Sequence, residues 1–379
     1  MSKPIRVGLI GLSSTQTSWA GRWAESAHLP YLVKSPDYTI IALCNSSVAS
    51  AQKAITRHNL DPSKVKAYGD PVSLANDADV DLVVCCVNVE KHYELVKPVL
   101  QAGKDVYCEW PLAANLAQMN ELASLAKANN VRTVVGLQER LGAYVPAIRS
   151  LLGDGPGQIG SLLSSNMSMH MGHAFMGGIL PHDIAYIADV ESGGNLVTIP
   201  AIHSLDALIF ALGEIETCSI VIKNTRPTVD LVDGTFTTIV EPKHQKTAHD
   251  HMFVNGTLEG DVPFSFTIRG GATFKDTPGL DWRIYGTKGE IRLTTNYGVL
   301  HGAGIEVKVQ VFWEGTGEVK DVDLAVGSTD AGFGLDSPAD DIARLYDAFA
   351  KRRTDQYLDF EGCLRWARFI QKAYDGEKQ

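Results

Sequence analysis

The stretch Pro4–Ala24, PIRVGLIGLSSTQTSWAGRWA, decides the fold. It opens with the apolar run Ile5–Leu12, turns at Gly11 and then repeats apolar residues at helical spacing. This order predicts a strand, a tight glycine turn and a helix, which bring backbone N–H groups and a helix N-terminus to one point where a phosphate can bind. The dinucleotide fingerprint G-x-G-x-x-G keeps its first glycine alone, because Ser13 and Gln16 occupy the other two glycine positions.

Two interpretations of this turn stay open. Serine, threonine and glutamine side chains can replace close backbone approach to a pyrophosphate with hydrogen bonds of their own. Alternatively, the segment is an ordinary turn between a strand and a helix in a sheet that binds no nucleotide. The first interpretation predicts cofactor contacts from Gly11, Leu12, Ser13, Ser14, Thr15 and Gln16.

Length and composition predict a two-domain globular protein. The chain has 379 residues, of which 45% are hydrophobic and 21% charged, enough for two cores and too apolar for a disordered chain. Its formal net charge of −10 argues against a nucleic-acid surface, which needs clustered lysine and arginine. The sequence has no apolar run of 18 residues and no secretory leader, so we expect a cytoplasmic protein without a transmembrane helix.

The six cysteines are predicted to be buried free thiols rather than metal ligands. Most lie inside apolar runs without metal-ligand spacing, which fits a reducing cytoplasm. Cys85 and Cys86 are neighbours on a predicted strand, so their side chains point to opposite faces. His170, His173 and His182 share one irregular segment, but their spacing does not indicate a metal site either. We therefore predict no metal site.

The tip of the second predicted strand bears on the choice of cofactor. Tyr38–Cys44 is apolar and is followed by Asn45, Ser46 and Ser47. In a dinucleotide-binding fold this tip faces the adenine ribose, where an acid would accept hydrogen bonds from the 2′-hydroxyl of NAD. A neutral polar tip leaves room for a 2′-phosphate, so the sequence favours NADP over NAD and predicts contacts from these three residues.

The first 140 residues alternate strands with helices. Val80–Val87 is a nearly continuous apolar run, which is typical of a strand covered on both faces. The pattern predicts a doubly wound parallel sheet, a dinucleotide-binding Rossmann domain at residues 1–140. The further predicted strands are Val65–Tyr68, Asp105–Cys108 and Val131–Leu137, and the helices are Ala49–His58, Pro71–Ala75, Tyr93–Ala102 and Asn115–Asn129.

Residues 141–379 follow a different pattern and predict a second, α+β domain for substrate binding and oligomerisation. Leu196–Ala211 is largely apolar, carries His203 and is predicted as a buried helix. From Glu216 to about Val322, alternating segments such as Thr235–Glu241 predict a large, mainly antiparallel open sheet. One face of that sheet is expected to be covered and the other left free, for a partner subunit.

Several landmarks fall along the chain in a fixed order. They are the VGLIGL turn, Val87 and Asn88 with His92, Glu109-Trp110-Pro111, Leu137-Gln138 with Arg140, a helix with His203 and Asp206, and Tyr285–Gly289. This set resembles the glucose–fructose oxidoreductase/inositol dehydrogenase (Gfo/Idh/MocA) family over essentially the whole chain. Within the family, the likeness is greatest to the branch that contains the fungal galactose-pathway repressor, through Gly136–Gln138, Leu196–Thr198, Lys246-Thr247 and Asp250-His251.

The resemblance implies a two-domain subunit whose nicotinamide lies between the domains, and homodimers or homotetramers built through the open sheet. Enzymes of the family transfer a hydride between nicotinamide and a sugar, cyclitol or related carbinol. The chain departs from the family at two positions. Trp110 stands where the family usually has a lysine that polarises the reacting oxygen, and Ile199 stands where an aspartate usually precedes the helix histidine.

The candidates for chemistry that remain are few. His203 is the predicted acid/base, since imidazole exchanges protons near neutral pH, although a histidine packed in a core has the same pattern. Trp110 could wall the nicotinamide, stack on a sugar or fill the space of the missing lysine. Tyr186 is an alternative proton donor, and Arg269 could bind an anionic group of the substrate or lie on the sheet surface. The resemblance adds cofactor contacts from Val87, Asn88, His92, Glu109, Trp110 and Gln138.

Three functions stay open. The first is an NAD(P)-dependent oxidoreductase that acts on a carbohydrate-like alcohol or carbonyl, with His203 moving the proton. The second is a non-catalytic regulator that senses NADP and binds a transcription activator, which the missing lysine favours. The third is an imine-type reductase, because a protonated imine is already electrophilic. We favour the first, since His203 is retained and the resemblance implies many enzyme-like relatives.

Overall fold

The computed structural model describes residues 3–15, 22–172, 175–324 and 332–377, and the chain divides into two compact units. The first unit contains Met1–Gln138, Glu191–Gly194 and Pro338–Phe369, and the second contains the remainder. The sequence-based domains, 1–140 and 141–379, stay a prediction. The segment Pro338–Phe369, from the end of the chain, belongs to the first compact unit.

The first unit is built on a six-stranded parallel sheet, as predicted. Its strands run in the order β3-β2-β1-β4-β5-β6, and every neighbouring pair is parallel. Chain order reverses at β1, so the carboxyl ends of β1 and β4 form the switch point of a doubly wound sheet. The strands are β1 (Ile5–Ile10), β2 (Tyr38–Cys44), β3 (Lys66–Tyr68), β4 (Leu82–Cys85), β5 (Asp105–Glu109) and β6 (Thr133–Gly136).

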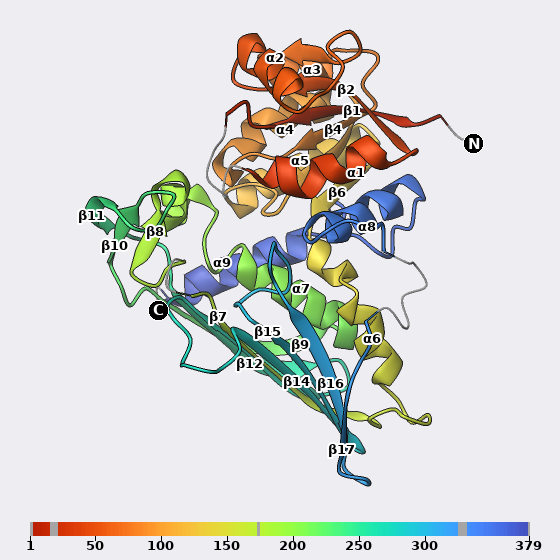
Figure 1. Cartoon of the computed structure of the whole chain (residues 1–379), viewed down its shortest axis with the longest axis vertical. Helices are drawn as coiled ribbons and strands as arrows, with labels where there is room; N and C mark the ends of the chain where they lie inside the picture. The colour runs from red at the N-terminus through yellow and green to blue at the C-terminus, as the bar shows by residue number, and fades with distance from the viewer. Residues whose placement is uncertain (1–2, 16–21, 173–174, 325–331, 378–379) are drawn as a thin grey trace. The chain divides into compact units, whose positions relative to one another are not determined.

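Helices accompany these strands (Figure 1). One group packs together through α3, α4 and α5, whereas α1 packs against α8 from the far end of the chain. Tyr31 of α1 stacks on Tyr346 of α8 with ring centroids 5.8 Å apart, which explains why the late segment joins the first unit. The helices are η2 (Ala24–His28), α1 (Leu29–Lys34), α2 (Val48–Arg57), α3 (Pro71–Ala75), η3 (Val89–Lys91), α4 (His92–Gln101), α5 (Leu116–Ala128) and α8 (Ala339–Ala350).

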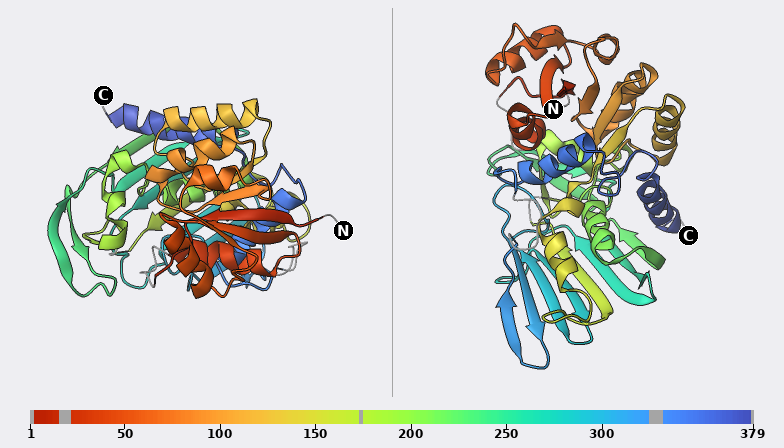
Figure 2. Two further views of the ribbon diagram at one scale, coloured as in Figure 1. Left: turned by 90° about the horizontal axis from the view of Figure 1, so that it is seen from above. Right: turned by 90° about the vertical axis from the view of Figure 1, so that its right-hand side faces the viewer.

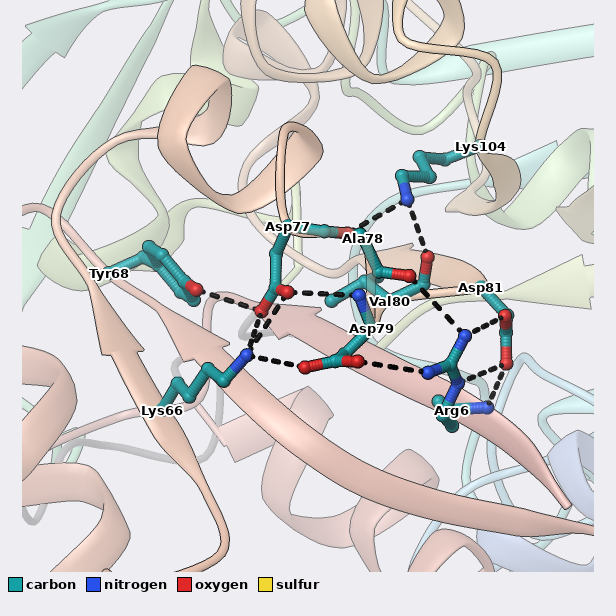
Figure 3. Close-up of polar contacts among 9 residues, drawn as sticks. All are labelled: Arg6, Lys66, Tyr68, Asp77, Ala78, Asp79, Val80, Asp81 and Lys104. Carbon is teal, nitrogen blue, oxygen red and sulfur yellow. Dashed lines mark hydrogen bonds and ion pairs between the residues drawn. The ribbon is translucent and has the colours of Figure 1, made fainter.

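A network of charged side chains lies at the amino ends of these strands (Figure 3). Arg6 on β1 donates from its backbone nitrogen, Nε and Nη2 to the carboxylate of Asp81, each at 2.9 Å. Lys66 on β3 forms ion pairs with Asp77 at 3.0 Å and with Asp79 at 2.8 Å. These contacts tie the loop before β4 to its neighbouring strands.

The second unit contains an eight-stranded sheet, which Figures 1 and 2 show as strands running side by side. The order is β17-β16-β15-β14-β7-β13-β12-β9; the β7–β13 pair is parallel and the other pairs are antiparallel. The mainly antiparallel prediction is therefore confirmed. The strands are β7 (Leu162–His170), β9 (Ile215–Lys223), β12 (His251–Leu258), β13 (Val262–Arg269), β14 (Leu280–Gly286), β15 (Gly289–Thr295), β16 (Val307–Trp313) and β17 (Glu318–Asp321).

Two helices of the second unit, α6 (Tyr144–Leu151) and α7 (Pro200–Leu212), pack against each other. The predicted helix Leu196–Ala211 begins four residues late, because the residue before a proline avoids helical geometry and Pro200 suits a helix start. Asn195 instead caps a turn there, accepting a hydrogen bond from the Val197 nitrogen at 3.0 Å. Helix η4 (Gln138–Leu141) precedes α6, and α9 (Leu364–Glu377) contributes residues to both units.

The predicted strand Thr235–Glu241 is wrong at its start. The backbone nitrogens of Thr235, Thr237 and Thr238 all donate to the Asp233 carboxylate, which makes an aspartate turn of this segment. The strand that follows belongs to a three-stranded sheet of order β11-β10-β8 that the sequence did not predict. Its strands are β8 (Ile179–Pro181), β10 (Thr228–Val232) and β11 (Ile239–Gln245), and η5 (His182–Ala188) and η6 (Val190–Ser192) lie in the same region of the sequence.

In the ranges that the structure covers, none of the helices combines the length and the apolar character needed to cross a membrane. The six cysteines are free thiols, and five of them are buried. Burial raises the pKa of the Cys86 thiol well above its usual value, so this thiol is protonated at neutral pH.

Candidate functional site

The turn after β1 depends on Gly11. Its φ angle is +100°, and a Cβ placed on it would lie 2.2 Å from the Cys86 carbonyl oxygen and 2.6 Å from Val87 Cγ1. A side chain here would have to push the end of β4 away. Gly11 therefore allows two strand ends to approach closely at the switch point, which is where open parallel sheets bind ligands.

Neighbouring side chains hold the carbonyl groups of this turn. Asn45 Nδ2 donates to the Leu12 carbonyl oxygen at 2.9 Å, and His58 Nε2 contacts the Ser13 carbonyl oxygen at 2.9 Å. By contrast, the backbone N–H groups of Leu12, Ser13 and Ser14 have no hydrogen-bond partner among the residues described. A turn with open N–H groups and occupied carbonyls fits a phosphate, so these residues fit a dinucleotide. Gln16, also predicted as a contact, lies outside the described residues.

The tip of β2 is polar and carries no carboxylate. Ser46 and Ser47 are exposed, whereas Asn45 is half-buried. The Ser47 side chain caps α2 by accepting a hydrogen bond from the Ser50 nitrogen at 3.2 Å. Ser50 Oγ in turn donates to Ser14 Oγ at 3.1 Å, so the tip and the β1 turn are joined. The ribose contacts predicted for this tip stay a prediction.

The carboxylate of Glu109, at the end of β5, is bonded on both oxygens. His28 Nε2 lies 3.0 Å from Oε1, and Trp23 Nε1 donates to Oε2 at 2.9 Å. Glu109 occupies the space beside Gly136, where a Cβ would lie 2.5 Å from Oε1. The sequence marked Glu109 as a strand-end residue but gave no sign of His28 or Trp23, which come from the helix after the β1 turn.

A buried tyrosine extends this arrangement. Tyr346 on α8 places its hydroxyl 2.8 Å from His28 Nδ1, and His28 is fully buried. Burial raises the pKa of Tyr346 well above its usual value, so the hydroxyl keeps its proton and is able to donate a hydrogen bond to Nδ1 when that nitrogen carries no hydrogen. His28 then carries its own proton on Nε2 and donates to Glu109, which fixes one tautomer across three elements.

His92 connects the ends of β4 and β5. Its Nδ1 lies 2.8 Å from the Pro111 carbonyl oxygen and its Nε2 lies 2.9 Å from the Val87 carbonyl oxygen. Burial lowers the pKa of His92, although both carbonyl contacts favour the charged form. The ring thus holds two strand ends together, and its cofactor contact stays a prediction. The same holds for half-buried Val87, exposed Asn88, buried Trp110 and buried Gln138.

Two buried cysteines and a buried histidine lie close together, although their spacing along the sequence is not that of a metal site. The ligating atoms of Cys85, His92 and Cys108 all lie within 4.8 Å of one another. Burial raises the pKa of the Cys108 thiol, and both ring nitrogens of His92 already contact carbonyl oxygens. This chemistry describes a packed core, and the absence of a metal site stays a prediction.

In the second unit, His203 lies in a cluster of polar side chains. His301 Nδ1 is 2.6 Å from Glu139 Oε1, and Ser204 Oγ donates to Glu139 Oε2 at 3.0 Å. The rings of His203 and His301 have centroids 5.6 Å apart. Glu139 is 1% exposed and His203 is 5% exposed, so the acid and this imidazole are shielded from bulk water, whereas His301 is half-buried. An acid that orients one imidazole beside another is typical of general acid–base sites.

A buried ion pair holds the elements that carry this cluster. Arg140 Nε and Nη2 each donate to the Asp206 carboxylate at 2.7 Å, and the guanidinium lies over the Phe210 ring at 4.7 Å. Arg140 follows Glu139 on η4, and Asp206 lies on α7 with Ser204 and His203. The bidentate pair therefore sets η4 against α7 and positions Glu139.

Sequence reasoning predicted His203, which stays a prediction, and did not name Glu139 or His301. His301 lies 162 residues beyond Glu139, in a glycine-rich loop after β15 that offers no local signal. Tyr186, the alternative proton donor, is half-buried on η5, and His170 ends β7. His173 lies outside the described residues.

Two family models match this chain. Residues 5–137 match the oxidoreductase family with an NAD-binding Rossmann fold (GFO/IDH/MocA), and residues 144–295 match the C-terminal domain of Gal80p. Dehydrogenase aclE of Aspergillus oryzae is 30% identical over 373 residues, which cover 93% of this chain and 94% of that protein. The chain belongs to this oxidoreductase family. The resemblance inferred from the motifs is thereby confirmed.

The family also includes a regulatory relative. The galactose/lactose metabolism regulatory protein GAL80 of Kluyveromyces lactis is 32% identical over 308 residues, 78% of this chain; the chain spans 65% of that protein. The crystal structure of the transcriptional regulator Gal80p from the same yeast has a TM-score of 0.82 and 27% identity, covering 100% of this chain and 90% of that one. Proteins similar to this chain thus include a dehydrogenase and a transcriptional regulator, so family membership alone does not decide between catalysis and regulation.

Proposed function

We propose that this chain is an NAD(P)-dependent oxidoreductase that transfers a hydride between nicotinamide and a sugar-like or related small carbonyl or alcohol substrate. The observation that carries the proposal is the cluster of Glu139, His301 and His203. A regulator that only senses a nucleotide has no need of a buried carboxylate that orients an imidazole. Oxidation of a carbinol needs a proton acceptor, which an oriented imidazole provides, because the hydroxyl proton must leave as the hydride does.

The nucleotide is assigned to the Gly11 turn and the tip of β2. Half-buried Ser13 and Ser14 offer N–H groups to its phosphates beside buried Leu12, and Asn45, Ser46 and Ser47 leave a neutral tip that favours NADP. When bound, the nicotinamide supplies the site that accepts or donates the hydride.

The proton is assigned to the histidine pair. When Nδ1–H of His301 donates to Glu139, the lone pair on Nε2 can accept a proton, and Glu139 stabilises the imidazolium that forms. His203 on α7 is the group predicted to exchange this proton with the substrate oxygen, with Tyr186 as the alternative donor. Trp110 adds an apolar wall where the family usually has a lysine, so these imidazoles have to supply the polarisation.

Two alternatives have support of their own. The match of residues 144–295 to the C-terminal domain of Gal80p favours a non-catalytic, NADP-sensing regulator that binds a transcription activator. Trp110 in place of the lysine favours an imine-type reductase, since a protonated imine is electrophilic without help. Neither alternative gives the Glu139–His301 pair the role proposed above, which is to take up the proton of a carbinol.

The test is a single-turnover absorbance trace of the reduced nicotinamide. The whole chain, loaded with NADP or NADPH, is mixed with sugars, sugar acids, cyclitols and simple imines. We expect hydride transfer with at least one sugar-like compound, and a rate about 10²-fold lower in H203N, H301N and E139Q.

The matched control is the exposed pair Glu241–His244, which has the same residue types at 2.7 Å on β11. E241Q and H244N should keep the full rate. If H301N and E139Q transfer hydride as fast as these controls, the cluster is structural. Tight nicotinamide binding without transfer to any compound in the panel would favour the regulator.

A further inference from the structure

An arginine pair in the second unit has no acidic partner. Arg269 ends β13 and His170 ends β7, and the two residues are opposite each other in the parallel register of these strands. Just beyond the two strand ends, the Gly271 nitrogen donates to the Gly172 carbonyl oxygen at 3.0 Å. Glycine suits both positions of this bridge, since Gly172 and Gly271 have φ angles of +75° and +91°.

The guanidinium of Arg269 is held by neutral groups alone. Nη1 donates to the carbonyl oxygens of Gly270 and Gly271 at 3.1 and 3.3 Å, and Nη2 donates to the Ala272 carbonyl oxygen at 3.0 Å. Of the five N–H groups of an arginine, these bonds use three. The Nε–H and one Nη2–H remain, and this is the side of the fork that binds carboxylates and phosphates with two parallel hydrogen bonds.

Arg226 lies beside the same glycine. A Cβ placed on Gly271 would be 3.5 Å from Arg269 Nη1 and 3.6 Å from Arg226 Nη2, so both guanidinium groups flank one small space. Arg226 is positioned through its backbone nitrogen, which donates to Asp250 Oδ2 at 2.9 Å, while its side chain is exposed.

Neither arginine has an ion pair among the residues that the structure describes. Asp250, which accepts the bond from the Arg226 backbone nitrogen, is committed elsewhere: its carboxylate lies 3.1 Å from Lys246 Nζ and 2.6 Å from His251 Nδ1. In a chain with 44 acidic and 34 basic residues, two adjacent arginines without a carboxylate are unexpected. Two like charges beside one glycine favour the binding of an anion from outside the chain.

His170 supplies a third polar atom near this pair. Its Nδ1 is buried and has no hydrogen-bond partner in the described part of the chain. Burial and the positive charge of Arg269 both lower the pKa of His170, so the ring is neutral at neutral pH and adds a hydrogen-bonding group without further charge.

We infer that Arg226 and Arg269 form a binding site for the carboxylate or phosphate group of a small ligand, such as a sugar acid or a sugar phosphate. The fork of Arg269 faces the anion from a fixed position because three carbonyl groups hold it. Arg226, which is exposed and held through its backbone, adds a second positive charge beside Gly271. The site goes beyond the proposed function and requires no hydride transfer.

The test is isothermal titration of the whole chain, without nicotinamide, with gluconate, glucose 6-phosphate, inorganic sulfate and neutral glucose. We expect the anions to bind more tightly than glucose, and R226Q to weaken the anions at least about tenfold, which is the loss of one charged hydrogen bond. R226K should retain part of the affinity because it keeps the charge. R269Q should weaken binding further, but it also releases three carbonyl groups.

Arg283 on β14 is the matched control, since it lies on the same sheet and is paired with Glu290 at 3.3 Å. R283Q should bind the anions as the native chain does. If the native chain binds none of the anions, or if R226Q binds them as tightly as R283Q, the inference is overturned. Gluconate and glucose 6-phosphate then separate a carboxylate ligand from a phosphate ligand. Failure here leaves the hydride-transfer result untouched, because the two experiments share no readout.

Discussion

The two ends of the six-stranded sheet treat charge in opposite ways. At the amino ends, Arg6 and Lys66 form ion pairs with the aspartates of the loop before β4, so each positive charge lies beside a negative one (Figure 3). At the carboxyl ends, the Glu109 carboxylate is bonded by an imidazole and an indole, and the Gly11 turn presents open N–H groups. The contacts at the amino ends join neighbouring strands, whereas the turn at the carboxyl ends has N–H groups without a partner among the described residues.

This difference indicates at which end of the sheet a substitution should lower the stability of the protein. Exposed ion pairs are screened by water and salt, so each contributes little to stability. Buried groups at the carboxyl ends have no such screening, and their loss leaves unpaired donors or clashing atoms. The predictions below separate the two ends, from the largest expected effect to the smallest.

Replacing Gly11 with alanine should have the largest effect. The new Cβ would lie 2.2 Å from the Cys86 carbonyl oxygen at a φ angle of +100°, so the free energy of unfolding should fall by about 2–4 kcal/mol. NADP binding should be lost with it. The measurements are urea denaturation and a fluorescence titration with NADP.

Gly103 is the matched control for this substitution. It has a positive φ angle of +71° but no atom within 4 Å of a placed Cβ. G103A should therefore cost about 1 kcal/mol from backbone strain alone and leave NADP binding unchanged. If G11A and G103A are equally stable, the close approach of β1 and β4 at Gly11 does not limit the side chain at this position.

Glu109→Gln should be next in size. The amide offers one acceptor oxygen where the carboxylate had two, so either His28 or Trp23 loses its partner, at a cost of about 1–3 kcal/mol. The exposed Glu121, paired with Lys97 at 2.7 Å, is the control, and E121Q should change little. If NADP affinity falls in E109Q once its lower stability is taken into account, the predicted ribose contact is supported; unchanged affinity makes Glu109 structural.

Ser47→Asp should change cofactor preference without changing stability. Aspartate caps helices as well as serine does, so the bond from the Ser50 nitrogen is kept. The new carboxylate would repel a 2′-phosphate and accept from the ribose, and we expect the NADP/NAD affinity ratio to fall about tenfold. S47A should lower stability through the lost cap and change the ratio less than S47D does, because it adds no carboxylate; a constant ratio in S47D refutes the assignment of this tip.

Arg6→Gln at the opposite end should have the smallest effect. The hydrogen bonds of Arg6 lower the pKa of Asp81, and such a shift contributes stability that is present at neutral pH and lost as the pH falls through the lowered pKa. R6Q should therefore be slightly less stable than the native chain at pH 7, and the two should converge in acid. Denaturation curves across this pH range, with K53Q as the surface control, test the sign. NADP binding should not change.

The local patterns that the sequence carries were sufficient for the first sheet. Val80–Val87 and Tyr38–Cys44 are short apolar runs, and burial on both faces of a parallel strand leaves that signature in the residues themselves. Gly11 was found for the same reason, because a turn between strand and helix is decided by a few consecutive residues. Strand and helix positions in the first unit therefore follow closely from the sequence.

The second unit shows where local pattern fails. Thr235–Glu241 has the alternation of a strand, but the Asp233 carboxylate captures three backbone nitrogens and turns the chain before Ile239. Pro200 delays α7 although Leu196–Ile199 is apolar. In both cases one side chain or ring competes with the pattern, and pattern alone does not weigh that competition.

The sequence by itself determined the fold class, the family and the glycine turn after β1, since each rests on short motifs whose residues are close along the chain. The tertiary structure alone decided which distant polar groups meet. Glu139 and His301, Arg226 and Arg269, and His28 and Tyr346 are brought together by strand order and helix packing. A buried donor or acceptor has to find its partner in three dimensions, and residue spacing carries no record of which partner it finds.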